Sequence, residues 1–334
     1  MRLRMGCTYD KARGNAAMVP NQTKFEPAGW LRCLAGAVVL ALALCGGVDA
    51  AAVSKQKQFA TPEEAVTSFM AALKSNDEKA LIAIFGADAK ALISSGDPVA
   101  DKRQRETFIA DYERKNRLAQ EGTGMVLSVG EKDWPFPIPL VQAGGRWVFD
   151  TKAGKEEILN RRVGKNEADT VQTLLAIVDA QREYAAKPRG KDGVRQYADR
   201  FASDPGTQNG LYWRTAPGEE QSPLGELVAD ARAEGYTRKG QAQGPVPYHG
   251  YYFRILKKQG KNAAGGAFDY VAKNRMIGGF AVVAYPAVYG SSGVMTFIVN
   301  HDGVVYQKKL GRETAKAATA MASFDPDASW KKVE

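Results

Sequence analysis

The sequence is poor in the residue types that most often carry chemistry. Only three of its 334 residues are cysteines and only two are histidines. Cys7, Cys33 and Cys45 all lie in the first 45 residues, so the rest of the chain has no thiol. Structural zinc and iron–sulfur sites need several such ligands at short spacing. We therefore expect no metal site, no cofactor and no cysteine nucleophile in the body of the protein.

The chain also lacks a concentrated positive stripe. Its formal net charge is +9, but the basic residues are scattered in short doublets such as Lys257-Lys258, Lys308-Lys309 and Lys331-Lys332. Nucleic-acid-binding proteins usually concentrate lysine and arginine residues on one face, beside aromatic side chains. We therefore expect no nucleic-acid partner. Weak attraction to anionic lipid headgroups or wall polymers is compatible with such a surface.

A long hydrophobic run is missing as well, apart from one short stretch near the start. Leu34 to Leu44 is apolar, follows Arg32 and leads to small residues around Ala50 and Ala51. This is the composition of a secretory signal peptide, and the run is short for a membrane span. Residues 1–51 are thus expected to be a leader cleaved near Ala50/Ala51, which predicts a periplasmic or secreted protein.

Two alternatives to plain cleavage exist. An uncleaved leader would give membrane contact through that segment alone. Cys45 could be the lipid-modified residue of a lipoprotein. Leu44 occupies the position where a lipidation signal requires a small residue, so cleavage without lipidation is favoured. Export would explain the thiol-free body, because no cysteine is left to mispair in an oxidising compartment.

Hydrophobic periodicity predicts an α+β protein with two domains, residues 52–160 and 161–334. The first has a helix start at Thr61-Pro62, further helices, and a small antiparallel sheet ending at Arg146–Asp150. This order resembles the cystatin-like cone.

The second domain is expected to combine a long helix with an antiparallel sheet. Glu167 to Tyr184 has apolar residues at helical spacing, and Tyr248 to Tyr306 contains short Val-, Ile- and Tyr-rich runs cut by glycine turns. Gly154 to Asn160 and Val194 to Phe201 are also predicted to be helical.

Several segments together resemble the bacterial family known as domain of unknown function 2950, nearly end to end from Phe59 to Trp330. The segments that carry the resemblance include Leu92-Ile93-Ser94-Ser95-Gly96-Asp97, Asp133-Trp134-Pro135-Phe136-Pro137-Ile138-Pro139, Gly210-Leu211-Tyr212-Trp213 and Pro247-Tyr248-His249-Gly250-Tyr251-Tyr252. The resemblance implies an exported protein of Gram-negative-type bacteria and implies no known reaction.

From about Glu167 onward the chain also resembles the globular part of type II secretion pseudopilins. A helix ending Ala180-Gln181-Arg182-Glu183-Tyr184 is followed by an irregular loop and by strands with Tyr289-Gly290-Ser291-Ser292-Gly293. The processing site and the apolar helix of true pilins are absent, so a pilin-like fold would not imply assembly into a pilus. Pseudopilins often hold calcium in an acidic loop. The loop at 189–193 keeps one acidic residue, which is too few oxygen ligands.

The two histidines are the first candidates for chemistry. In a strand, His249 would share a face with Tyr251 and could act as a base, or it could simply bond backbone at the end of the sheet. His301 lies in Asn300-His301-Asp302-Gly303, a sequence typical of a tight turn. A Ser–His–Asp triad from Ser291 or Ser292, His301 and Asp302 can be drawn, but no nucleophile-elbow pattern surrounds either serine.

Aromatic and arginine side chains form the candidate binding surface. Aromatic rings beside guanidinium groups can line a groove for a sugar or a peptide, and the same residues can equally be core. The candidate residues are Trp213, Arg214, His249, Tyr251, Tyr252, Arg254 and His301.

The sequence favours a non-enzymatic binding or assembly module of the cell envelope, with an envelope protein or a polysaccharide or peptide ligand as partner. The alternative is a hydrolase that acts on a cell-wall or extracellular polymer through His249. The sequence leaves the oligomeric state open.

Overall fold

The computed structural model describes residues 56–190, 192–236 and 245–333. The expected leader, including Leu34 to Leu44, Cys45 and the cleavage site at Ala50/Ala51, lies outside these residues. Residues 51–334 form one compact unit. In the described part of the chain, no helix combines the length and the apolar character needed to cross a membrane.

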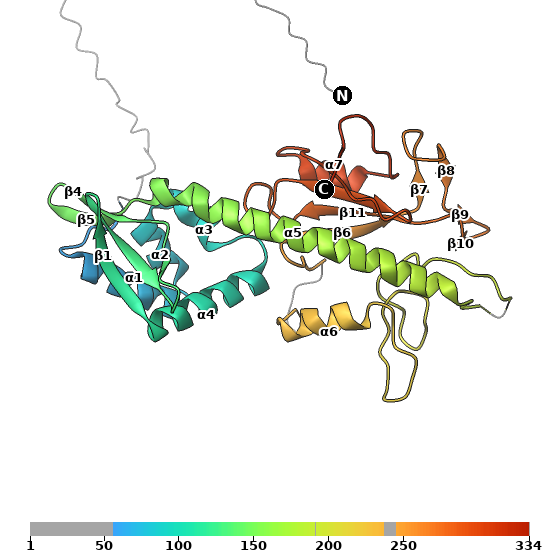
Figure 1. Ribbon diagram of the computed structural model, residues 1–334, viewed down its shortest axis with the longest axis horizontal. Coiled ribbons are helices and arrows are strands. Elements are labelled where there is room, and N and C mark those ends of the chain that lie inside the picture. Colours follow the sequence, from blue (N-terminus) through green and yellow to red (C-terminus); the bar gives the residue numbers. More distant parts are fainter. Residues whose placement is uncertain (1–55, 191, 237–244, 334) are drawn as a thin grey trace, which may run out of the picture. The chain divides into compact units, whose positions relative to one another are not determined.

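The protein has an α+β fold, as predicted (Figure 1). Its first part contains α1 (Pro62–Ser75), α2 (Glu78–Phe85), α3 (Lys90–Ile93), α4 (Pro98–Arg114), β1 (Asn116–Glu121), β2 (Gly124–Val129), β3 (Trp134–Pro135), β4 (Leu140–Ala143) and β5 (Arg146–Phe149). Then come α5 (Thr151–Ala186), α6 (Gly225–Ala233), β6 (Tyr251–Leu256), β7 (Lys258–Gln259), β8 (Phe268–Asp269), β9 (Val271–Ala272), β10 (Arg275–Met276), β11 (Ala281–Pro286), β12 (Thr296–Asn300), β13 (Tyr306–Lys308), α7 (Thr314–Ala320) and β14 (Lys331–Lys332).

The first helix begins where the sequence signals it. The Thr61 side chain accepts a hydrogen bond from the Glu64 amide at 3.1 Å, and the Glu64 carboxylate accepts one from the Ala60 amide at 2.9 Å. The first bond is that of a capping box, whereas the second goes to the residue before the N-cap and not to Thr61 itself. The helix buries Phe69, whose ring lies 5.2 Å from that of Phe136 and 5.1 Å from that of Phe85. Aromatic contacts thus fasten α1 and α2 to the first sheet.

The first sheet is antiparallel, in the order β1-β2-β4-β5, with β3 paired to β2. The segment after Asp133 forms only the two-residue strand Trp134–Pro135 before its prolines stop further pairing. Helix α4 ends at Arg114, because the chain turns at Lys115 into strand β1.

Helix α5 is one continuous element. The two helices predicted at Gly154–Asn160 and Glu167–Tyr184 are parts of it, and the expected domain boundary at residue 160 falls inside it. A Cβ at Gly154 would lie 2.3 Å from the Pro137 carbonyl oxygen, so only glycine lets the helix approach the first part this closely. Ile158 packs on the first core, the cluster that contains Phe69 and Phe149. Further along, Leu174 and Val178 belong to the second core, the cluster that contains Val283 and Ile298. The helix therefore packs against both cores.

The second sheet has the strand order β14-β13-β12-β11-β6 and is antiparallel throughout. Tyr252 pairs with Tyr285 and Arg254 with Val283, so these side chains share one face. Arg254 donates to the carbonyl oxygens of Ala318 in α7 and of Met321, the C-cap of that helix. Helix α7 therefore covers this face of the sheet. The alternate residues face α5. The central strand β11 is buried along its whole length, as a strand covered on both faces must be.

One predicted helix does not form. Residues Val194 to Phe201 are irregular, with a single bridge that joins Tyr197 to Met276. The prediction was wrong because tertiary bonds replace the helical ones. The Gln181 side chain, from α5, accepts from the Ala198 amide at 2.9 Å and donates to the Ala198 carbonyl at 2.8 Å.

Candidate functional site

His249 lies in a tight turn that precedes the strand, not in the strand itself. Tyr248 and Tyr251 exchange two backbone hydrogen bonds of 2.8 and 3.1 Å. The two residues between them, His249 and Gly250, have φ values of 49° and 76°. Positive φ at both central positions defines a type I′ turn, where His249-Gly250 takes the place of the usual Asn-Gly. The expectation that His249 shares a strand face with Tyr251 is therefore wrong.

The turn fixes His249 between two carboxylates. Its Nδ1 lies 3.4 Å from Asp169 Oδ2 and its Nε2 lies 3.6 Å from Glu234 Oε2. The ring packs on Tyr248 at 4.1 Å, and only 8% of the residue is exposed. A neutral imidazole has one donor, so it cannot satisfy both carboxylates. Burial outweighs the pull of Glu234 and Asp169, and it lowers the pKa of His249.

Each carboxylate also has a cation at hand. Glu234 Oε2 lies 2.6 Å from an Arg103 guanidinium nitrogen, and Asp169 Oδ2 lies 2.5 Å from Lys165 Nζ. Burial raises the pKa of Tyr248 to about 12, so its hydroxyl stays neutral at physiological pH. The charges around His249 are therefore already balanced without a proton on its ring.

Asp97 is the centre of the neighbouring hydrogen-bond network. It is fully buried and caps α4 through bonds from the amides of Val99 and Ala100 at 3.2 and 3.1 Å. Its other oxygen accepts from the Tyr236 hydroxyl and from the Gly250 amide, both at 2.8 Å. One carboxylate thus joins the first helix cluster to the turn that carries His249.

A second buried contact runs beside the first. Arg162 on α5 donates to the carbonyl oxygens of Ala91 and Leu92 at 2.7 and 2.6 Å, and its residue is 8% exposed. Asn166, one turn later, donates to the Ser292 carbonyl at 2.9 Å. Burial lowers the pKa of Arg162.

The buried hydrogen bonds described so far link elements of both cores. We call the residues that make them the polar seam: Asp97, Arg162, Asn166, Tyr236, His249 and Gly250.

The tyrosines that follow His249 lie on opposite faces of the sheet. Tyr251 is fully buried on the α5 face, and its hydroxyl donates to the Met295 carbonyl at 3.0 Å. Tyr252 is half-buried on the other face, with its ring 5.6 Å from that of Tyr285. Arg254 lies on that face as well. Strand alternation therefore prevents these three residues from forming one binding surface.

The Trp213 and Arg214 pair is also divided. Trp213 belongs to the second core, and its ring nitrogen donates to the Glu220 carbonyl at 3.3 Å. Arg189 lies over its ring at 5.1 Å, and over Tyr184 at the same distance. Arg214 is exposed. Trp213 thus packs in the core, where it helps to bury the Arg189 guanidinium.

His301 lies at the other end of the second sheet from His249. It follows Asn300, which is joined through Ala281 to Leu256, the far end of the strand that begins at Tyr251. Five residue steps along a strand span about 17 Å. Its neighbours Asn300 and Asp302 bond each other in a turn, at 3.1 and 3.2 Å. The two histidines therefore belong to separate places.

The Ser–His–Asp triad considered from the sequence is not assembled either. Ser291 donates to the carbonyl oxygens of Ala91 and Ser94, and Ser292 donates to that of Val288. Both serines precede β12, which begins at Thr296. His301 follows the end of that strand. The length of β12 separates the serines from the histidine.

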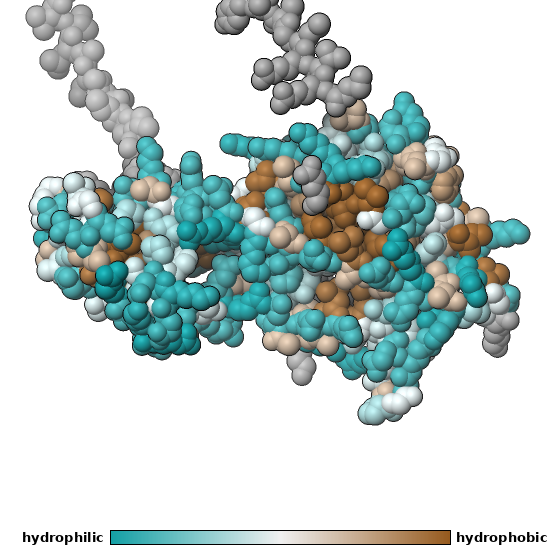
Figure 2. Space-filling model, viewed as in Figure 1, coloured by the Kyte–Doolittle hydropathy of each residue, from teal (hydrophilic) through white to brown (hydrophobic). Residues whose placement is uncertain are grey.

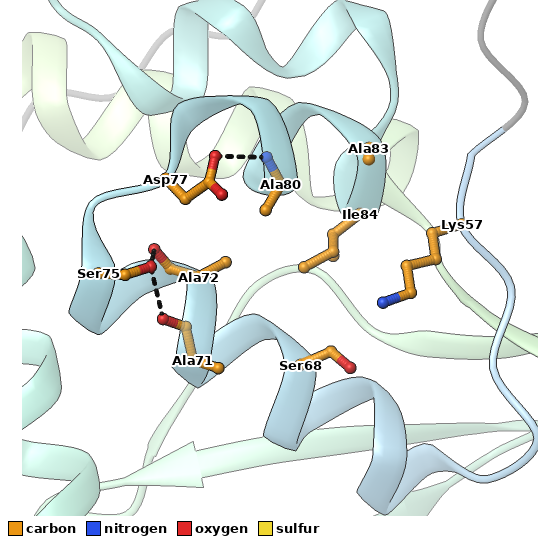
Figure 3. Close-up of a pocket in the computed structure, with 9 residues that line it drawn as sticks. All are labelled: Lys57, Ser68, Ala71, Ala72, Ser75, Asp77, Ala80, Ala83 and Ile84. Carbon is orange, nitrogen blue, oxygen red and sulfur yellow. Dashed lines mark hydrogen bonds between the residues drawn. The ribbon is translucent and has the colours of Figure 1, made fainter.

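An open cavity lies in the first part of the protein (Figure 3). Its volume is about 640 Å³. One face of α1, one face of α2 and the residue Lys57 enclose it; the lining residues are Lys57, Ser68, Ala71, Ala72, Ser75, Asp77, Ala80, Ala83 and Ile84. A positive and a negative side chain lie among alanines, two serines and one isoleucine. None of the lining residues belongs to the polar seam.

Sequence reasoning missed the partners of His249. Asp169 and Glu234 occur in ordinary charged helix faces, and only the fold brings them to the turn. Asp97 had a readable signal, since an Asp before Pro98 marks a helix start. Arg162, Asn166 and Thr170 repeat every four residues and are buried, but a polar stripe on a helix normally faces solvent, so the sequence carried no signal of their burial.

In the described residues, no group of three or more His, Cys, Asp or Glu side chains is placed to hold a metal ion. The geometry of the polar seam is that of a tightly bonded joint with a buried histidine. By fold and site, then, this is an α+β protein whose two cores share one long helix and a buried polar joint.

The chain belongs to a known family. Residues 56–333 match the family model described as protein of unknown function (DUF2950), which covers nearly all of the described chain. The resemblance drawn from the sequence segments is thereby confirmed at the level of the family. No curated protein and no solved structure gave a match.

Proposed function

We propose that the protein is a non-enzymatic binding module of the bacterial cell envelope, and that its cavity between α1 and α2 takes a short peptide. The cavity carries the proposal. Its volume of about 640 Å³ lies in the range of small-ligand sites. A small-residue lining leaves room for a backbone with short side chains.

The lining chemistry favours a peptide over a sugar. Sugar sites usually offer an aromatic ring for the sugar face, and none of the nine lining residues is aromatic. Lys57 can attract a terminal carboxylate, and Asp77 can attract a terminal ammonium group. A peptide with free ends supplies both charges.

The buried histidine supports binding over hydrolysis. A general base must reach the proton that it abstracts. His249 is 8% exposed and packed between Tyr248, Asp169 and Glu234. Its partners hold the turn in place, and a nucleophilic serine is not among them. The alternative of a polymer hydrolase acting through His249 is accordingly the less favoured proposal.

An envelope location is part of the same proposal. It is supported by the leader composition, by the family resemblance and by the absence of cysteine after Cys45. The cystatin-like and pseudopilin-like descriptions of the two parts remain proposals as well. A long helix that packs on an antiparallel sheet is consistent with the second of them.

Binding can be tested with trialanine that carries free termini, using chemical-shift changes in the nuclear magnetic resonance spectrum of residues 51–334. Ala83 lines the cavity and is exposed, so Ala83→Trp should fill the space and abolish the shifts. Ala110→Trp, on the exposed side of α4, is the matched control and should bind as the wild type does. Acetylated, amidated trialanine should bind more weakly, because both terminal charges are gone. Equal shifts in all three proteins would refute the cavity as the site.

A further inference from the structure

An exposed apolar rim lies on the excursion that leaves the second sheet after β6. Ile277 is 46% exposed and directly follows β10, and Phe268 is 40% exposed and lies in β8. Val194, 38% exposed, lies in the chain between Asp192, which pairs with Arg275, and Tyr197, which bridges to Met276. Single exposed apolar residues are ordinary, but a group of them needs a reason.

The rim is held in a fixed shape. Phe268 packs edge-on against Tyr270 at 5.6 Å, and the Tyr270 carbonyl accepts from the Gly278 amide at 2.9 Å, directly after Ile277. Tyr270 itself is fully buried, and its hydroxyl donates to Gln259 at 2.9 Å. The two apolar side chains therefore flank one anchored tyrosine.

The same excursion is strongly basic. Residues 257–278 contain five basic side chains and one acidic side chain, Asp269. Lys257 and Arg275 are paired with Asp199 and Asp192. The other three, Lys258, Lys261 and Lys273, are exposed, and none has a carboxylate of the described chain within 4.0 Å. Figure 2 shows hydrophobic residues gathered on the part of the protein that holds the second sheet, with hydrophilic residues around them.

We propose that this rim docks on an anionic phospholipid bilayer, with Phe268 and Ile277 entering the headgroup region and the three lysines contacting lipid phosphates. Apolar side chains next to cations are the combination by which proteins lie on an anionic membrane without spanning it. A soluble polyanion would satisfy the lysines but leave the apolar side chains in water. Edge protection explains a lysine in a strand such as Lys258 in β7. It explains neither Lys261 and Lys273, which lie in turns, nor the two exposed apolar residues.

The proposal can be tested by sedimentation of residues 51–334 with vesicles, one set of phosphatidylcholine alone and one with phosphatidylglycerol added. This compact unit omits the apolar leader, which would bind lipid by itself. We expect binding to the anionic vesicles only, weakened by salt. Each lysine near an anionic surface contributes about fivefold in affinity. The triple variant Lys258→Gln, Lys261→Gln, Lys273→Gln should thus lose roughly 100-fold.

Two further variants separate the apolar and ionic parts. Phe268→Ser with Ile277→Ser should lose at least about tenfold in affinity, since partial burial of both side chains is gone. Val288→Ser with Val304→Ser removes two comparably exposed apolar residues elsewhere, at 43% and 36%, and should leave vesicle binding unchanged. Lys79→Gln, Lys90→Gln, Lys132→Gln is the matched charge control.

Several outcomes would overturn the proposal. Failure of the wild type to sediment with anionic vesicles, or equal loss in the control variants, would do so. Release by sodium phosphate beyond that by sodium chloride of equal ionic strength would indicate a free-phosphate site. A change in oligomeric state in the Phe268→Ser, Ile277→Ser variant without a change in vesicle binding would indicate contact between copies of the chain.

Discussion

The smallest feature that governs this protein is the turn His249-Gly250. Its glycine has a φ of 76°, and a Cβ there would lie 2.7 Å from Asn166 Nδ2. Its amide is also bonded to Asp97. Backbone angle, close packing and a buried hydrogen bond thus all depend on one residue without a side chain.

Gly250→Ala should therefore lower the free energy of unfolding by about 2 kcal/mol or more, since strain and a clash add at this position. Chemical denaturation measures the loss. Gly144→Ala is the control, because its φ is also positive, at 60°, while nothing lies within 4 Å of its added Cβ. It should cost clearly less. Equal costs would mean that the packing against Asn166 does not matter.

His249 gives the protein a predicted pH dependence. Burial lowers its pKa in the folded state below the unfolded value of about 6.5. Below that value the unfolded chain binds the proton more readily, so stability falls as the pH drops from about 6.5 toward the folded pKa. Asp169, Glu234, Lys165 and Arg103 set the balance around the ring.

The melting temperature of the wild type should thus decrease between pH 7 and pH 5 by more than that of His249→Gln, which has no proton to gain. Asp101, whose pKa is raised by burial, shifts both proteins alike. Parallel pH profiles for the two proteins would show that the histidine is not the titrating group.

At the scale of elements, helix α5 carries the joint between the two cores. Arg162 is buried and bonds two carbonyl oxygens of the first part, whereas its neighbour Arg161 is half-exposed and pairs with Glu157 on its own helix. Loss of a buried charged group strands its partners without a bond, while exposed ion pairs contribute little.

Arg162→Ala should therefore cost about 3 kcal/mol in the free energy of unfolding, because two carbonyl oxygens lose a charged donor. Arg161→Ala should cost less than about 1 kcal/mol. Urea titration of both variants provides the comparison. Similar costs for the two arginines would contradict the assignment of Arg162 to the polar seam.

Elements were also where the sequence was most and least informative. The helix at Glu167–Tyr184 was predictable because Leu174 and Val178 repeat at helical spacing, and the capping box at Thr61 was predictable from local chemistry. The bonds of Ala198 to Gln181 were not, because they connect residues that only the fold brings together. The carboxylates beside His249 could not be predicted either. Asp169 and Glu234 are distant from His249 in the sequence, and no regular spacing connects them to the turn.

At the scale of the whole molecule, the described residues form one compact unit. Helix α5 contributes to both cores, and Asp97 and Arg162 cross between them with buried bonds. Heating should give a single transition, with equal calorimetric and van't Hoff enthalpies. Two separate transitions would show that the polar seam does not couple the cores.

Two features of the whole molecule favour binding over catalysis. The protein presents an open, small-residue cavity on one part and keeps its histidine buried in the joint. The most direct measurement is chromatography of isolated cell-wall polymer after prolonged incubation with the wild type and with His249→Gln. We predict that neither protein releases more soluble fragments than buffer alone. Release by the wild type that is lost in His249→Gln would contradict the account and establish the hydrolase.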